Sequence, residues 1–265
     1  MRDESEETKA IGYPFDQPVF VVYTGDTQIR SADEVDFDQT VLGERIEALS
    51  RDGEIVAFRL IELLNAAVGV SEVEEFRLYK EFDPEKIDDA LDRVEWGADA
   101  VTVAGDLMSN LILSHSLPNA NHRTAIAMLQ FCIECVDPTF SMPRTHLDDE
   151  TWHDWVDPYI VRFKEIITVR RNNRRFHHLH ELGVELVERK DGIRIDLTTF
   201  DLDMPIRQAH QTYARRHESL CHDFATEAIS RSNRPSLAER SGPTRSDFID
   251  YLESGEKARD LDRLF

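Results

Sequence analysis

Apolar residues recur at helical spacing through the middle of the chain. Between residues 101 and 112 they stand three and four positions apart, the spacing that places side chains on one face of a helix. These residues are Val101, Val103, Ala104, Leu107, Met108, Leu111 and Ile112. A second apolar run covers residues 125–136. The pattern predicts two core helices, the second starting at Ala120, joined by a short loop from His115.

Similar periodicity predicts helices on both sides of this pair. Apolar positions indicate helices over residues 42–49 and 55–70, with a break at Asp52 and Gly53. Asp83 and Pro84 are typical of a helix start, because Asp caps a helix and Pro suits its first turn. Further helices are expected over residues 151–169 and 206–229. A linker at residues 231–244, which are rich in Ser, Pro and Gly, leads to a final short helix and tail at residues 247–265.

Alternating and β-branched stretches are few. Residues 17–24 predict one strand, and residues 184–188 and 193–197 predict a hairpin around a turn at residues 189–192. The fold class expected is therefore mainly α, with a small β hairpin.

Charge adds to this picture. The chain has 52 acidic and 31 basic residues, a net charge of −21, and only six of the bases are lysines. Such a surplus of acids is typical of proteins from salt-rich cytoplasms, so we expect a halophilic host. No apolar stretch is long enough for a membrane span and the N-terminus lacks an apolar signal region, which predicts a cytoplasmic protein that does not act at a membrane.

The basic residues gather in one place, residues 170–175, followed by His177, His178 and His180. One interpretation is a set of cations at the C-terminus of the helix over residues 151–169. A second is a docking site for a phosphate-bearing ligand, a nucleic acid or an acidic partner, and nucleic acid is not expected elsewhere on this acidic chain. A third is that the histidines bind a metal.

Three cysteines are too few for a disulfide framework. Cys132 and Cys135 form a C-x-x-C pair inside the predicted core helix, where small apolar residues are expected. Together with Cys221 and His222 they are a weak candidate for a zinc site.

The loop at residues 115–125 holds the strongest candidate chemistry. Pro118 favours an extended Leu117, and Asn119 is a good N-cap for a helix that begins at Ala120. The amides of residues 120–123 would then form an anion site at the positive end of the helix dipole, with Arg123 in its first turn. His115 adds a base to this anion site.

This loop resembles the signature of the Fic/Doc (Fido) family, closest to its death-on-curing (Doc) branch, whose motif is His-x-Phe-x-Asp-Ala-Asn-Lys-Arg-Thr-Ala. The matching residues are His115, Ala120, Asn121, Arg123, Thr124 and Ala125, and Leu117 keeps the buried apolar position. The resemblance covers about residues 80–165. It implies a Fido-type helical core at residues 80–168, an N-terminal capping region at 1–79 and a helical C-terminal extension with the hairpin at 169–265.

The resemblance also implies roles for the loop residues. ATP is the donor, and neutral His115 is the base that takes the proton of a protein hydroxyl. The amides of Ala120, Asn121 and His122 bind phosphate, and the side chain of Asn121 fixes the loop or binds a phosphate oxygen. Arg123 stabilises the charge on the transferred group.

Two departures from the family pattern bear on the activity. His122 stands where AMP-transferring relatives have Gly, and Ile126 stands where they have a second Arg, which favours phosphorylation over AMP transfer. Asn119 replaces the acidic residue that holds Mg²⁺, so Asn119 is a weak metal ligand. Asp106 or Asp148 would have to substitute for that acid if Mg²⁺ is bound.

We therefore expect a transferase that moves a phosphoryl group, or AMP, from ATP onto a Ser, Thr or Tyr hydroxyl of a target protein, with Mg²⁺. It would be a toxin of a toxin–antitoxin pair. The family's self-inhibitory motif is not evident after Ser50 and Glu54, so a separate antitoxin protein is the expected restraint. The alternative is a catalytically degenerate Fido scaffold that binds nucleotide or a partner protein.

Overall fold

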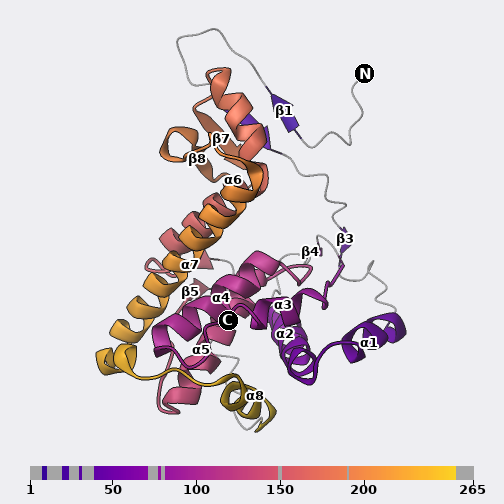
Figure 1. The fold of residues 1–265 in the computed structure, drawn as a ribbon, viewed down its shortest axis with the longest axis vertical. Coiled ribbons are helices and arrows are strands. Elements are labelled where there is room, and N and C mark those ends of the chain that lie inside the picture. The colour runs from indigo at the N-terminus through magenta and orange to yellow at the C-terminus, as the bar shows by residue number, and fades with distance from the viewer. Residues whose placement is uncertain are drawn as a thin grey trace. The chain divides into compact units, whose positions relative to one another are not determined.

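The computed structural model describes residues 8–10, 20–23, 30–31, 39–70, 77–78, 81–148, 151–189 and 191–254 (Figure 1). Within these residues the protein is mainly α-helical, with eight α-helices and short strands, as the sequence predicts. The described residues contain no helix with the length and apolar character that crossing a membrane requires.

The chain forms two compact units, each discontinuous in sequence. The first comprises residues 1–28 and 159–217, and the second comprises residues 29–158 and 218–265. The three regions expected from the family resemblance were consecutive, whereas these units are each assembled from separate segments. Helices α6 and α7 contribute residues to both units.

The first unit contains the small sheet. Its strands lie in the order β1 (Thr8–Ala10), β2 (Phe20–Tyr23), β7 (Leu186–Arg189) and β8 (Arg194–Asp196). Strands β7 and β8 pair antiparallel, which confirms the predicted hairpin, and β2 confirms the predicted strand. Strand β2 pairs with β7 in parallel, Phe20 opposite Leu186, and this pairing could not be inferred from the local pattern. The short helix η2 (Leu197–Thr199) follows β8.

Helix α6 (Asp157–Glu181) is longer than expected and begins later. The residues expected to start the helix, 151–156, precede it, and Ile160, Phe163 and Ile167 are buried on its inner face. Val169, Asn173 and Phe176 are also buried, so the inward face continues past residue 169. The basic residues at 170–175 therefore lie inside the helix, where the interpretation of cations at a helix C-terminus was wrong. Of the histidines that follow them, His178 and His180 do lie in the last turn of α6.

The second unit is a helical core. It contains α1 (Gln39–Glu47), α2 (Arg51–Val70), α3 (Lys86–Leu91), α4 (Ala100–Ser114), α5 (Asn121–Val136), the 3-10 helix η3 (Pro235–Glu239) and α8 (Arg245–Ser254). Helix α7 (Ile206–Arg231), close to its predicted range, contributes residues 218–231. Two short strand pairs, β3 (Arg30–Ser31) with β4 (Arg77–Leu78) and β5 (His146–Asp148) with β6 (Thr151–Trp152), complete this unit.

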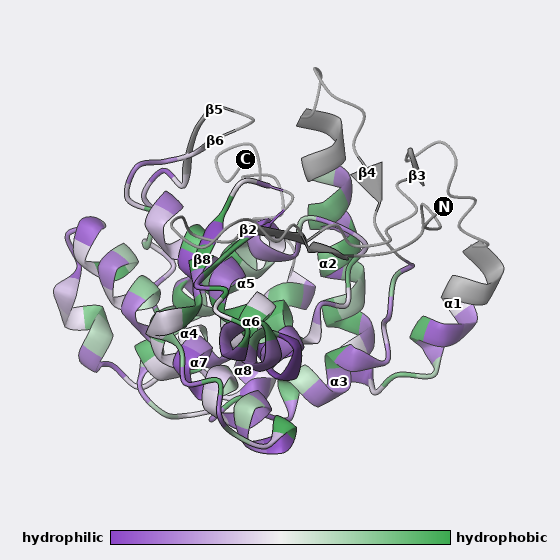
Figure 2. Cartoon of the chain, turned by 90° about the horizontal axis from the view of Figure 1, so that it is seen from above, coloured by the Kyte–Doolittle hydropathy of each residue, from purple (hydrophilic) through white to green (hydrophobic). Residues whose placement is uncertain are grey.

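Hydrophobic residues concentrate on the inner faces of these helices. Val103, Leu107 and Met108 of α4 are fully buried, as are Ala125 and Leu129 of α5. Figure 2 shows hydrophobic residues along α2. Helix α3 also turns apolar residues inward: Ile87, Ala90 and Leu91 are buried. The helical pair predicted around the loop therefore lies at the centre of this unit, with α4 and α5 packed along one another.

The break between α1 and α2 lies before its predicted place at Asp52 and Gly53. It falls at residues 48–50, and Gly53 lies in the first turn of α2. The hydroxyl of Ser50 accepts a hydrogen bond from the Gly53 amide at 3.1 Å and so caps α2. A Cβ atom at residue 53 would lie 2.2 Å from an oxygen of the Asp88 carboxylate. Asp88 can therefore approach α2 this closely only because residue 53 is a glycine.

The start of α3 also differs from expectation. Helix α3 begins at Lys86, because residues 83–87 form a turn in which the Ile87 amide donates to the Pro84 carbonyl at 2.9 Å.

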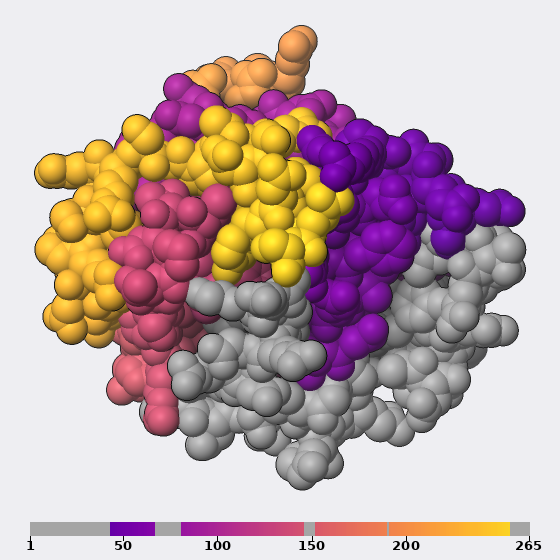
Figure 3. All heavy atoms as spheres, turned by 90° about the horizontal axis from the view of Figure 1, so that it is seen from below, coloured from indigo at the N-terminus to yellow at the C-terminus, as the bar shows by residue number. Residues whose placement is uncertain are grey.

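The expected linker at residues 231–244 is packed: the Ala100 amide donates to the Arg240 carbonyl at 2.8 Å, and Leu237 is buried. Helix α8 contacts α2 and α5, and Figure 3 shows its yellow atoms between indigo and pink ones. Residues 255–265 of the expected final helix and tail lie outside the described residues.

Candidate functional site

The loop between α4 and α5 is anchored by the side chain of Asn121. Its Nδ2 donates to the Leu117 carbonyl at 2.9 Å, and its Oδ1 accepts from the Leu117 amide at 3.1 Å. Asn121 and Leu117 are both buried. Two roles were predicted for the Asn121 side chain, fixing the loop or binding a phosphate oxygen. The structure supports the first, because both polar atoms of the side-chain amide hydrogen-bond to the Leu117 backbone.

A second anchor joins the loop to the chain before α3. The Asp83 amide donates to the Ser116 carbonyl at 2.9 Å, and Ser116 is buried. The residues that hold the loop, 116–118 and 121, are buried, whereas the candidate site residues other than Asn121 are partly exposed. These partly exposed residues are His115, Asn119, Ala120, His122 and Arg123. The loop therefore has a buried inner side and a partly exposed outer side.

His115 ends helix α4 in the left-handed conformation, with φ 49° and ψ 49°. Its amide still bonds the Leu111 carbonyl at 3.2 Å, the arrangement of a helix that ends in a left-handed residue. This conformation turns the chain sharply at His115, so the imidazole lies at the start of the loop.

Helix α5 begins one residue later than predicted. Ala120, not Asn119, is the N-cap residue, in the left-handed region at φ 56°. The Asn119 side chain does not reach the first turn of the helix, because its Oδ1 accepts from the neighbouring Ala120 amide at 2.6 Å. The Thr124 amide makes the first helical bond, to the Ala120 carbonyl at 2.9 Å. The amides of residues 121–123 precede that bond, at the positive end of the helix dipole.

Arg123 lies in this first turn, with its guanidinium carbon 5.7 Å from the centre of the Trp152 ring. Stacking on an aromatic ring restricts the guanidinium while leaving its edges able to bind phosphate. Ile126, three residues further along α5, is buried in the core. The loop thus combines one arginine with the helix N-terminus.

Magnesium does not fit this loop well. Asn119 carries no charge, and its oxygen already accepts a hydrogen bond from Ala120. Asp106 cannot replace the missing acid, because it lies nine residues before His115, about 13 Å along α4 at the helical rise. Asp148, the other acid named for this role, ends strand β5, and its side chain is not among the parts of the chain that the structure describes.

The cysteine site expected with His222 does not form. Burial raises the pKa of the Cys132, Cys135 and Cys221 thiols, that of Cys135 to about 11, which opposes metal binding by thiolate. Among the described residues, one group of three or more possible metal ligands comes together, Asp106, Glu218 and His222. It includes neither the cysteines nor His177, His178 and His180. From the sequence, Asp106 and His222 are candidates for other metal sites. The one sequence signal for Glu218 is its spacing of four residues from His222, which places both side chains on one helix face.

Comparison with known proteins identifies a family, but its description states no activity. The model of a family of unknown function (DUF8172) matches residues 1–256. No curated protein and no solved structure matches the chain. The resemblance to the Fic/Doc family therefore stays a prediction, carried by the loop residues themselves.

Proposed function

The chain belongs to this family of unknown function, and we propose that it is a Fic/Doc-type transferase that moves a phosphoryl group, or AMP, from ATP onto a hydroxyl of a target protein. The observation that carries the proposal is the pair of hydrogen bonds between the Asn121 side chain and the Leu117 backbone. These bonds hold the segment between a base, His115, and a phosphate-binding helix start. Motif residues that were matched only by sequence thus have a physical reason to occur together.

The proposed step follows from these groups. The imidazole of His115 takes the proton of the target hydroxyl, and the hydroxyl oxygen attacks the γ-phosphorus of ATP. The bond from that phosphorus to the bridging oxygen breaks, and ADP leaves with its electron pair. Attack on the α-phosphorus would instead transfer AMP and release pyrophosphate. The amides at the start of α5 and the Arg123 guanidinium stabilise the negative charge of the transferred group.

Phosphorylation is the preferred form of the proposal. The buried Ile126 leaves no second arginine at the position that holds the terminal phosphate in AMP-transferring relatives. His122 also carries a bulky side chain where those relatives have glycine. Both differences are those that the Doc-like motif implies for transfer of the terminal phosphate. A Ser, Thr or Tyr of another protein would be the acceptor, and a separate antitoxin would restrain the enzyme.

One observation favours a second candidate function. Asn119 supplies no charge for Mg²⁺ and its oxygen is already hydrogen-bonded. The alternative is accordingly a scaffold that binds nucleotide or a partner protein at the same loop without transfer.

Labelled ATP separates these functions. The full chain is incubated at high salt with Mg²⁺, a lysate of the source organism, and ATP labelled at the γ- or the α-phosphate. Protein labelled from γ alone identifies a kinase, and protein labelled from α identifies an AMP transferase. His115→Ala should abolish the label, and His178→Ala, at an exposed histidine of α6, should not. Absence of label from both positions, with nucleotide still bound, would establish the scaffold and overturn the transferase.

A further inference from the structure

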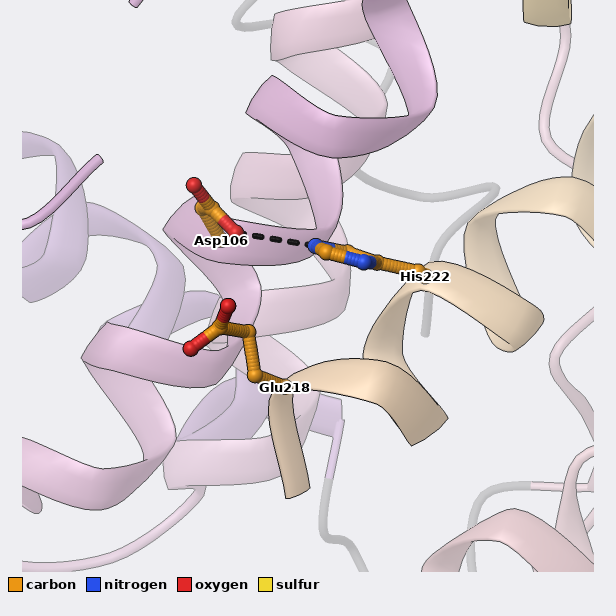
Figure 4. Close-up of side chains that lie close together, drawn as sticks. All are labelled: Asp106, Glu218 and His222. Carbon is orange, nitrogen blue, oxygen red and sulfur yellow. Dashed lines mark hydrogen bonds and ion pairs between the residues drawn. The ribbon is translucent and has the colours of Figure 1, made fainter. Parts of the chain in front are cut away.

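A second cluster of ionisable side chains lies between α4 and α7, away from the loop (Figure 4). Glu218 and His222 are four residues apart on α7, so both side chains lie on one face of that helix. Asp106 of α4 faces them, and one ligand atom from each of the three residues lies within 4.8 Å of the other two. The His222 Nε2 atom lies 2.8 Å from Asp106 Oδ1.

The backbone is shaped to allow this approach. A Cβ atom on Gly105 would lie 2.2 Å from His222 Cδ2 and 2.9 Å from the His222 amide nitrogen. Only glycine therefore lets α4 come this close to His222. Asp106 is buried, and its second oxygen accepts a hydrogen bond from the Glu95 amide at 3.0 Å. The carboxylate is held in place by the backbone, as metal-binding carboxylates commonly are.

The cluster brings two carboxylates to one imidazole. The contact between His222 and Asp106 already pairs one imidazole with one carboxylate. Glu218 brings a second carboxylate to the same imidazole, and Asp99 adds a further negative charge nearby. With a neutral imidazole the three grouped side chains carry two negative charges, which a divalent cation would balance. Cys221, next to His222, is buried and hydrogen-bonds to Ser109, so its thiol is not part of the group.

We propose that Asp106, Glu218 and His222 form a binding site for a divalent transition-metal ion of the zinc type. One imidazole nitrogen and two carboxylate oxygens are ligands that zinc accepts, and the i, i+4 pair on α7 presents two of them from one helix face. A three-ligand set leaves a fourth position for water or an exogenous ligand. The bound ion would join α4 to residues 218–231 of α7. This site is separate from the transfer loop and does not depend on the proposed transferase activity.

Zinc binding to the metal-stripped full chain tests the proposal. Isothermal titration should give one ion per chain, and zinc should raise the thermal midpoint. Glu218→Gln should weaken binding about tenfold or more, because it removes a charged ligand from a partly exposed position. His222→Gln and Asp106→Asn should do the same. Glu227→Gln, on the same helix but paired with Arg231, is the matched control and should bind zinc as the natural chain does.

Cobalt gives an independent test of the ligand set. The Co²⁺ complex should show the absorption of a nitrogen and oxygen site, without thiolate charge-transfer bands. The proposal is overturned if the natural chain binds no zinc, if Glu218→Gln and His222→Gln bind as tightly as the natural chain while folded by circular dichroism, or if thiolate bands appear.

Discussion

The side-chain amide of Asn121 makes two hydrogen bonds to the backbone of Leu117, one to its carbonyl and one from its amide. Both residues are buried, so these bonds replace contacts with water that the Leu117 backbone cannot make.

Replacing Asn121 by Ala should therefore destabilise the protein and abolish transfer. Loss of the side chain leaves two buried backbone groups without their partner, at a cost of about 1–3 kcal/mol in the free energy of unfolding. Urea unfolding measures that cost and the labelled-ATP assay measures the activity. Asn121→Asp keeps the acceptor for the Leu117 amide but places a buried carboxylate oxygen against the Leu117 carbonyl, so it should also be less stable than the natural chain. Full activity in Asn121→Ala would show that the loop does not need this anchor.

Asn119→Asp should increase the transfer rate in the presence of Mg²⁺. A carboxylate can still accept the hydrogen bond from the Ala120 amide, so the loop should keep its shape. It also supplies the charge that makes an acid the preferred magnesium ligand. The labelled-ATP assay, run with increasing Mg²⁺, compares the two chains. Equal rates at every Mg²⁺ concentration would show that the missing carboxylate does not limit activity.

Gly105→Ala should destabilise the protein, because the added methyl group would overlap the ring and backbone of His222. Overpacking of this kind costs about 1–3 kcal/mol. Gly43→Ala, in α1, is the matched control: no atom lies within 4 Å of its added Cβ, and Ala favours a helix over Gly. Chemical denaturation should show loss of stability in the first variant and none in the second. Equal stability of the two variants would contradict the close packing of α4 against α7.

Stability should fall as the pH drops below the ordinary pKa of histidine, in part because of His217. Burial, and secondarily the positive charge of Arg170, lower the pKa of this histidine to about 3. Between that value and about 6.5, the unfolded chain takes up a proton that the folded chain does not, so acid favours unfolding. The contribution is at most about 1.4 kcal/mol per pH unit.

Urea unfolding at about pH 7 and about pH 5 measures this effect. In His217→Gln the loss of stability between the two pH values should be smaller than in the natural chain. Above pH 7 both chains should respond alike to pH, since the histidine is then neutral in both states. An unchanged difference between the two pH values would show that His217 is accessible to protons in the folded protein.

Salt should stabilise the protein. Its net charge of −21 produces repulsion that a high ionic strength screens. The urea midpoint should therefore be higher in about 2 M KCl than in about 0.1 M KCl, where the Debye length is about 10 Å. A stability maximum at the lower concentration would count against a salt-rich cytoplasm as the origin of this composition.

The sequence by itself determined the elements whose signals are local. The helical spacing of apolar residues placed α4 and α5 on either side of the loop, and alternation around residues 189–192 predicted the hairpin. The residues at which helices end did not follow from the sequence alone, because capping depends on the direction of a side chain as well as on its type. Asn119 is of a type that caps helices well, but its side-chain oxygen accepts from the Ala120 amide, and Ala120 is the N-cap residue.

Only the tertiary structure decided which distant residues meet. Asp106 and His222 lie 116 residues apart and touch because Gly105 lets α4 approach α7. Strand β2 likewise lies beside β7 although helices α1 to α6 separate them in the chain. Periodicity reports which face of an element is buried, but not which other element covers that face. For that reason the loop could be predicted from the sequence, whereas the group of Asp106, Glu218 and His222 appeared only when the helices packed.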